Sequence, residues 1–194
     1  MASAISILRR ELAQETSPEP EVVMKNLNSI MSDDLFSTNC FITMVLARYT
    51  PGTHQLVYAN AGHIYPIVWS HRSVVQQQTK PDVEVSVEPN YLKTRGVPLG
   101  ILPDWKAKAG ILTLNPGEIF LLISDGITEA TVKEAMNNGS SEPCTGSMLG
   151  ASGLWQLLLQ EPVPFDLTHL LACIRERTTN VQEDDQTILS LEVL

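Results

Sequence analysis

Two acidic features of the chain are placed where a folded protein can use them for chemistry. Asp125 follows a predicted buried strand and precedes Gly126, whereas Asp184 and Asp185 directly precede the last predicted strand. A carboxylate at the end of a strand is held at the rim of a sheet, and a neighbouring glycine allows a sharp turn or a close approach of backbone. Converging carboxylates repel one another unless one is protonated or a cation is bound.

The donor type indicates which cation would suit such a site. Carboxylate oxygens are hard ligands, so Mg²⁺ or Mn²⁺ fits an all-oxygen site. Each feature also has an ordinary explanation, because Asp-Gly pairs are common in turns and Asp-Asp pairs are common in solvated loops. The residues alone leave the metal and the structural interpretations open.

An acidic composition narrows the classes of partner. The 194 residues include 22 Asp+Glu against 13 Lys+Arg, for a formal net charge of −9. Nucleic acids and anionic membrane surfaces both bind basic protein surfaces, so the charge argues against both partners. An acidic protein can still hold a phosphorylated substrate if a bound cation supplies the positive charge.

Composition and cysteine usage indicate a globular protein that we expect in the cytoplasm. Hydrophobic residues make up 43% of the chain, enough for a core. The apolar N-terminal run ends at Arg9 and Arg10, which fits neither a membrane span nor a signal peptide. Cys40, Cys144 and Cys173 show no zinc-site or disulfide spacing and are interpreted as idle or buried thiols in a reducing compartment.

The elements that must position the acids follow from periodicity and turn residues. Helices are predicted around residues 5–12, 21–31, 127–136, 154–159 and 167–177, and strands at 40–49, 55–60, 65–70, 73–78, 83–87, 110–114, 118–123 and 187–194. The strands at 40–49 and 55–60 are predicted to form a hairpin, as are those at 110–114 and 118–123. The apolar sides of the first two helices are predicted to carry Ile5, Leu8, Leu12, Val22, Val23, Leu27 and Ile30. Helices segregated from antiparallel strands define an α+β class.

Five short motifs occur in an order that resembles one enzyme family. They are residues 58–63 (YANAGH), 96–100 (GVPLG), 114–117 (LNPG), 120–130 (FLLISDGITEA) and 184–187 (DDQT). Each motif is weak by itself. Together, and in this order, they resemble the SpoIIE/RsbU branch of the PPM-type, metal-dependent serine/threonine protein phosphatases.

The resemblance implies a fold and a reaction. The fold would be an antiparallel β-sandwich of two face-to-face sheets flanked by helices (αββα), as a single domain over residues 1–194 with a metal site at one edge. The reaction would be hydrolysis of phosphoserine or phosphothreonine, in which two Mn²⁺ or Mg²⁺ ions activate a bridging water. The partner typical of the branch is a phosphorylated STAS-type anti-sigma-factor antagonist in bacterial stress or sporulation signalling.

The resemblance also assigns roles to residues. Asp125 and Asp184 would be metal ligands, Asp185 would support them, and Gly126 would serve the turn, with no catalytic residue beyond the ligands. Asn60 and His63 would either support the site or belong to a structural turn. The remaining histidines match none of the motifs and are interpreted as surface or packing residues: His54, His71 and His169.

Two motifs that supply the family's remaining ligands do not occur in this sequence. They are a GDxYD-like strand and a following D-x-x-G-[KH]-G turn, and Asp33-Asp34 lacks the neighbouring glycine that would make it a substitute. Residues 1–4 resemble the tail of the helix that comes next in the family. We therefore expect an N-terminally incomplete domain whose exposed sheet edge favours homo-oligomers. The alternative function is an inactive phosphatase-like module that binds a phospho-protein partner.

Overall fold

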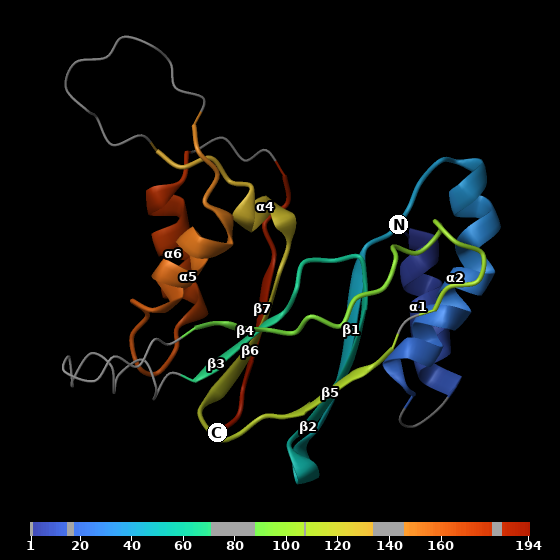
Figure 1. Cartoon of the computed structure of the whole chain (residues 1–194), viewed down its shortest axis with the longest axis horizontal. Coiled ribbons are helices and arrows are strands. Elements are labelled where there is room, and N and C mark those ends of the chain that lie inside the picture. Colours follow the sequence, from blue (N-terminus) through green and yellow to red (C-terminus); the bar gives the residue numbers. More distant parts are fainter. Residues whose placement is uncertain (1, 15–17, 71–87, 107, 134–145, 180–183) are drawn as a thin grey trace. The chain divides into compact units, whose positions relative to one another are not determined.

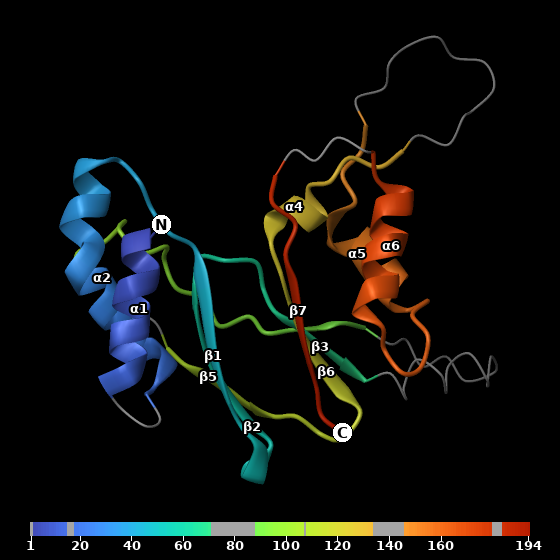
Figure 2. The same cartoon turned by 180° about the vertical axis from the view of Figure 1, so that it is seen from behind.

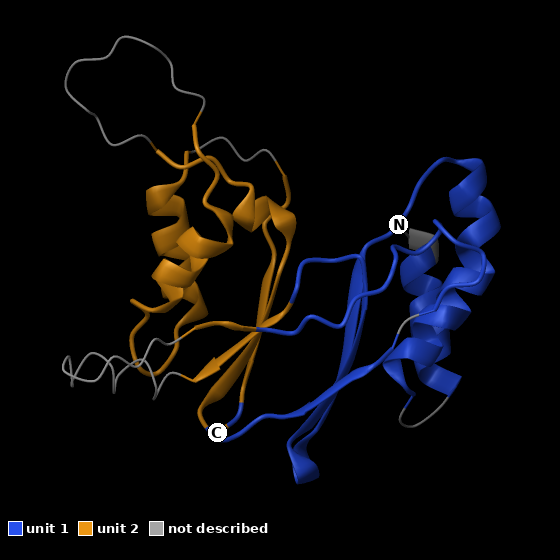
Figure 3. Cartoon of the chain, in the orientation of Figure 1, with its two compact units in different colours: residues 1–65, 91–116, 193 blue, residues 66–90, 117–192, 194 orange. Residues whose placement is uncertain are grey.

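The computed structural model describes residues 2–14, 18–70, 88–106, 108–133, 146–179 and 184–194 (Figure 1). The chain divides into two compact units (Figure 3). The first unit comprises residues 1–65, 91–116 and 193, and the second comprises 66–90, 117–192 and 194. Each unit has its own sheet, and the single domain expected over residues 1–194 stays a prediction.

The first unit combines two helices with a three-stranded antiparallel sheet. Its elements are α1 (Ala2–Gln14), α2 (Pro20–Ser37), β1 (Met44–Thr50), the 3₁₀ turn η1 (Pro51–Thr53), β2 (Gln55–Ala61) and β5 (Gly110–Thr113). The strand order is β1-β2-β5. The predicted first hairpin is confirmed, with Thr50 opposite Gln55 and η1 as its connection.

The buried faces of both helices in the first unit overlap the predicted ones only in part. The predicted Val23 and Leu27 are buried and Leu8 packs partly buried against the core, whereas Ile5, Leu12, Val22 and Ile30 are exposed. Residues that were not predicted join the core: Ala4, Met24 and Met31. The reason is that each buried face also contains a polar residue whose hydrogen bonds are satisfied inside the protein. The pattern of apolar residues places such a residue on the outward face of a helix.

Asn28 and Glu11 are these two polar residues. The Asn28 side chain accepts a bond from the Gly100 N–H at 2.9 Å and donates to the Leu102 carbonyl at 2.9 Å. Glu11 on α1 is only 7% exposed and accepts a bond from the Asn26 side chain at 3.0 Å. Their burial rotates the inward faces away from the predicted positions.

The described part of the second unit contains a four-stranded sheet and three helices. Its elements are β3 (Ile67–Ser70), β4 (Asn90–Tyr91), β6 (Glu118–Ile123), α4 (Asp125–Thr128), α5 (Gly150–Leu158), α6 (Leu167–Arg177) and β7 (Ile188–Glu192). The strand order is β4-β3-β6-β7, and β6 pairs antiparallel with both β3 and β7 (Figures 1 and 2). Trp69 of β3 makes edge-on ring contacts with Trp155 of α5 and with Phe165, which packs α5 and its connection to α6 against the sheet.

The predicted hairpin of residues 110–114 and 118–123 is wrong. The first of these strands pairs with β2, where Ile111 lies opposite Val57, and the second lies between β3 and β7. Asn115-Pro116-Gly117 therefore carries the chain from one sheet to another. Most side chains of the apolar β6 are buried, and β6 pairs with a strand along each edge, as a central strand of a sheet does. The segment between β2 and β3 likewise connects two different sheets.

The helix predicted at residues 127–136 is also wrong over its described part. Helix α4 ends at Thr128, and the β-branched Thr131 and Val132 form β-bridges with Met148 and Thr178. The predicted strands at 73–78 and 83–87, residues 134–136 and Cys144 lie outside the described residues.

Other predicted elements agree with the structure. Helix α6 has the predicted bounds. Asp166 caps its start, with a carboxylate that accepts bonds from the Thr168 and His169 N–H groups, and Arg175 and Arg177 lie in its last turn. The α+β class with antiparallel sheets is confirmed, whereas the face-to-face packing of the two sheets stays a prediction. In the described part of the chain, no helix combines the length and apolar character needed to cross a membrane.

Candidate functional site

The ends of β6 and β7 bring the predicted acidic features together at one edge of the second sheet. Ile123 lies opposite Ile188 in the register, and just beyond it the Ser124 N–H donates to the Thr187 carbonyl at 2.9 Å. The Ser124 hydroxyl donates to the Asp185 carbonyl at 2.7 Å and accepts from the Thr187 N–H at 2.8 Å. Three hydrogen bonds to one residue thus fix residues 184–187 beside the Asp125 turn.

Gly126 allows this close approach. A Cβ atom added at Gly126 would lie 2.6 Å from the Asp185 carbonyl oxygen and 3.2 Å from the Asp184 carbonyl carbon. The Gln186 side-chain amide donates to the Gly126 carbonyl at 3.2 Å. A glycine is therefore required at position 126, because the backbone of Asp184 and Asp185 passes too close to leave room for a side chain.

Asp125 and Asp184 have similar local settings. Both side chains are exposed. An Asp125 carboxylate oxygen accepts a bond from the Gly126 N–H at 3.1 Å, and an Asp184 carboxylate oxygen accepts one from the Asp185 N–H at 2.7 Å. These local bonds orient each carboxylate and leave its second oxygen available for a cation.

The donor set fits a hard divalent ion in kind, although it supplies few ligands. Carboxylate oxygens suit Mg²⁺ and Mn²⁺. Among the described residues, however, neither Asp125 nor Asp184 belongs to a group of three His, Cys, Asp or Glu side chains with donor atoms within 4.8 Å of one another. The assignment of both residues as metal ligands stays a prediction.

Asn60 and His63 lie in the first unit, where hydrogen bonds join them in a turn, and their supporting role at the metal site stays a prediction. The fully buried Asn60 side chain accepts from the His63 N–H at 2.8 Å and donates to the His63 carbonyl at 3.1 Å. Gly62 has a φ of 72°, and a Cβ there would lie 2.4 Å from Pro98 Cγ. Ala61 forms a β-bridge with Gly96, so two of the sequence motifs build one turn region.

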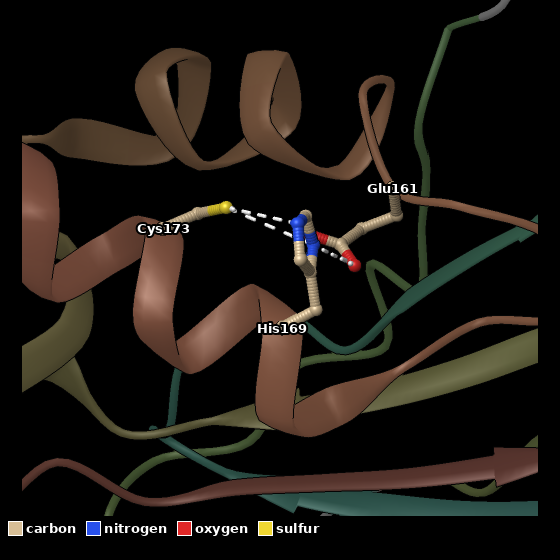
Figure 4. A group of neighbouring side chains, drawn as sticks. All are labelled: Glu161, His169 and Cys173. Atoms are coloured by element: carbon tan, nitrogen blue, oxygen red, sulfur yellow. Dashed lines mark hydrogen bonds and ion pairs between the residues drawn. The ribbon is translucent and has the colours of Figure 1, made fainter.

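A second group of potential ligands was missed by the sequence reasoning. Glu161, His169 and Cys173 of the second unit bring one oxygen, one nitrogen and one sulfur within 4.8 Å of one another (Figure 4). The four-residue spacing of His169 and Cys173 in a predicted helix was an available signal. Glu161 lies in the segment between α5 and α6, and its distance in sequence from His169 follows no helical spacing that would predict the contact. Ser124 was missed as well, although it stands directly before the Asp-Gly pair.

Solved structures define the class of fold. The SiaA-PP2C domain of Pseudomonas aeruginosa matches with a TM-score of 0.72 at 20% identity, covering 97% of this chain and 67% of that chain. The SpoIIE phosphatase domain of Bacillus subtilis, presoaked with manganese, matches with a TM-score of 0.53 at 15% identity, covering 98% of this chain and 73% of that chain. The fold is that of a PP2C-type phosphatase domain, which confirms the predicted PPM-like class.

Sequence comparison then identifies the family. Phosphoserine phosphatase RsbU of Bacillus subtilis (strain 168) is 34% identical over 115 residues, which are 59% of this chain and 30% of RsbU. The matched region is thus less than a third of that relative's length. The model of the Stage II sporulation protein E (SpoIIE) family matches residues 1–194, so the chain belongs to the SpoIIE family. This result confirms the resemblance inferred from the five motifs.

Proposed function

We propose that this chain is a protein serine/threonine phosphatase that hydrolyses phosphoserine or phosphothreonine with the help of Mn²⁺ or Mg²⁺. The observation that carries the proposal is the pair of hydrogen bonds between the Ser124 hydroxyl and residues 185 and 187, which we call the Ser124 clamp. These bonds bring the Asp125 and Asp184 segments to one edge of the sheet. Two comparisons support the same reaction: the matched relative RsbU is named a phosphoserine phosphatase, and this chain belongs to the SpoIIE family.

Each residue of this edge has a distinct task in the proposal. Asp125 and Asp184 would hold the cation, while Asp185 and Gln186 fasten their segment to Ser124 and Gly126. When bound, such ions supply an activated water and neutralise charge on the phosphoryl oxygens. The complete family site holds two ions, and a second ion would need ligands beyond these two carboxylates.

The proposed substrate is a phosphorylated regulatory protein, and a STAS-type anti-sigma-factor antagonist is the candidate implied by the motifs. The proposed setting is the bacterial cytoplasm. Association of copies through a sheet edge is a further proposal, since β1 and β7 lie at the ends of their sheets among the described strands and Leu189 of β7 is 52% exposed. Light scattering of the purified chain tests it, and a monomer at all concentrations would contradict it.

Hydrolysis of p-nitrophenyl phosphate across a manganese titration tests the enzymatic proposal. We expect activity that requires Mn²⁺ and is lost in Asp125→Asn, because the amide cannot supply the charge of a carboxylate ligand. The matched control is Asp104→Asn, an exposed aspartate of the first unit, which should keep full activity. A folded chain without activity at any manganese concentration would contradict the proposal.

A second candidate function is an inactive module that binds a phospho-protein without turnover. It is favoured by the small ligand set at Asp125 and Asp184 among the described residues. This function predicts that a phosphorylated partner is retained unhydrolysed and that Asp125→Asn leaves its affinity unchanged. Phosphate release by the wild-type chain would exclude it.

A further inference from the structure

Three side chains of the second unit form a compact group of mixed donors at α6. His169 Nδ1 lies 3.0 and 3.1 Å from the two carboxylate oxygens of Glu161. Cys173 Sγ lies 3.7 Å from each ring nitrogen of His169. Figure 4 shows the imidazole between the thiol and the carboxylate. The group is separate in sequence from Asp125 and Asp184 and shares no residue with that site.

The local structure holds these three side chains in place. His169 and Cys173 are four residues apart in α6, so they lie on one face of the helix. Asp166 fixes the start of that helix by accepting bonds from two backbone N–H groups, one of them that of His169. Glu161 follows α5, with its N–H directed to the Leu158 carbonyl at 3.4 Å.

Because Glu161 is buried, its charged form needs a nearby positive charge, which an exposed carboxylate does not. Its side chain is fully buried, whereas that of His169 is 48% exposed. Burial raises the pKa of Glu161, and the hydrogen bond and charge of His169 act in the opposite direction. A buried carboxylate needs a positive partner, and either a protonated imidazole or a metal ion satisfies it.

We propose that Glu161, His169 and Cys173 bind a zinc ion, with water at the fourth position. Zinc prefers Cys, His and carboxylate ligands in a tetrahedron, with bonds of about 2.0–2.3 Å. Ligand atoms of such a tetrahedron are separated by about 3.3–3.7 Å, as follows from these bond lengths. The separations of 3.0–3.1 Å and 3.7 Å in this group lie close to that range. The exposed side of His169 leaves the fourth position accessible to solvent.

The thiolate makes this site selective against the ions proposed for Asp125 and Asp184. Sulfur is a soft ligand that favours zinc over Mg²⁺ and Mn²⁺. Burial raises the pKa of the Cys173 thiol, and the nearby charges of Glu161 and Glu176 raise it further while Arg177 lowers it. Zinc would have to displace the thiol proton, and Nδ1 of His169, which faces Glu161, would have to bind the ion as an unprotonated nitrogen.

Cobalt absorption provides a test that reports on sulfur ligation directly. Co²⁺ replaces zinc in such sites, and a thiolate ligand produces a sulfur-to-metal charge-transfer band in the near ultraviolet. The titration is run on the full chain with excess Mg²⁺, which occupies the all-oxygen site. We expect the band in the wild type, its loss in Cys173→Ser, and its persistence in the matched controls Cys40→Ser and Cys144→Ser.

Zinc affinity, measured by competition with a chromogenic chelator, provides the second readout. Loss of an outer hydrogen-bonding partner costs a metal site about 10–100-fold in affinity, so loss of the direct ligand in Cys173→Ser or His169→Gln should cost at least that much. Far-ultraviolet circular dichroism checks that each variant is folded. No band in the wild type, or a band that survives Cys173→Ser, would overturn the proposal. Because Asp125 and Asp184 contain no sulfur, this outcome is independent of phosphatase activity.

Discussion

Gly126→Ala is the substitution whose effect the structure determines most sharply. The added Cβ would lie 2.6 Å from the Asp185 carbonyl oxygen, 3.1 Å from its carbonyl carbon and 3.2 Å from the Asp184 carbonyl carbon. These are backbone atoms held by Ser124, so they cannot move aside as the end of a flexible side chain would. Either the segment carrying Asp184 or the turn carrying Asp125 must shift.

The magnitude follows from the cost of overpacking and of misplacement. Inserting a methyl group into a well-packed position typically costs about 1–3 kcal/mol. A displacement of about 1 Å at a reacting centre lowers activity by about 100-fold. We therefore expect Gly126→Ala to lose about 1–3 kcal/mol of stability and most of its manganese-dependent activity.

Urea unfolding and p-nitrophenyl phosphate hydrolysis measure the two effects. The matched control is Gly52→Ala in the exposed turn η1, where an added Cβ meets no atom within 4 Å. Its stability should change by less than about 0.5 kcal/mol, with activity unchanged. Wild-type manganese requirement and activity in Gly126→Ala would refute the idea that the two acidic segments meet across this glycine.

Three further predictions concern hydrogen bonds and burial. Ser124→Ala removes the hydroxyl that donates to Asp185 and accepts from Thr187. The free energy of unfolding, measured in urea, should fall by about 1 kcal/mol, and activity should need more manganese. An unchanged manganese requirement would contradict the role of these hydrogen bonds. Asn60→Ala leaves the His63 N–H and carbonyl without their side-chain partner, which should cost about 1–3 kcal/mol in the same assay, and an unaltered midpoint would contradict the turn's role. In the chain freed of metal by a chelator, burial raises the pKa of Glu161 above its ordinary value, so its contribution favours folding at low pH and is lost as the pH rises through the folded pKa. Glu161→Gln lacks this loss, so the stability of the variant relative to the wild type should increase from acidic to neutral pH, and the opposite trend would contradict the pKa direction.

Local signals in the sequence predicted elements whose ends are set by nearby residues. Helix α6 has the predicted bounds because Asp166 caps its start and basic side chains occupy its last turn. The hairpin of β1 and β2 is likewise determined by a local turn at residues 51–53. The predicted hairpin across residues 115–117 was wrong because strand pairing there is decided by distant partners, Val57 for one strand and Ile188 for the other.

The candidate site shows the same division between local and distant information. Asp125 and Asp184 were predicted from their places at strand ends and from the motifs, and the structure brings their segments together. The part of Ser124 could not be predicted, because its hydroxyl bonds residues 61 and 63 positions away. The helix faces were predicted only in part, since the buried Asn28 finds its hydrogen-bond partners more than 70 residues away. Glu161 escaped notice because its contact with His169 depends on how the connection after α5 folds back onto α6.

The central claim is that Asp125 and Asp184 hold the cation that this chain uses to hydrolyse a phosphoprotein. Phosphate release from a phosphoserine peptide, followed across a manganese titration, tests it most directly. The account predicts release that saturates with manganese in the wild type and in Asp104→Asn, a shift to much higher manganese in Asp184→Asn, and no release in Asp125→Asn. Release that is independent of manganese, or equal in the wild type and Asp125→Asn, would contradict it.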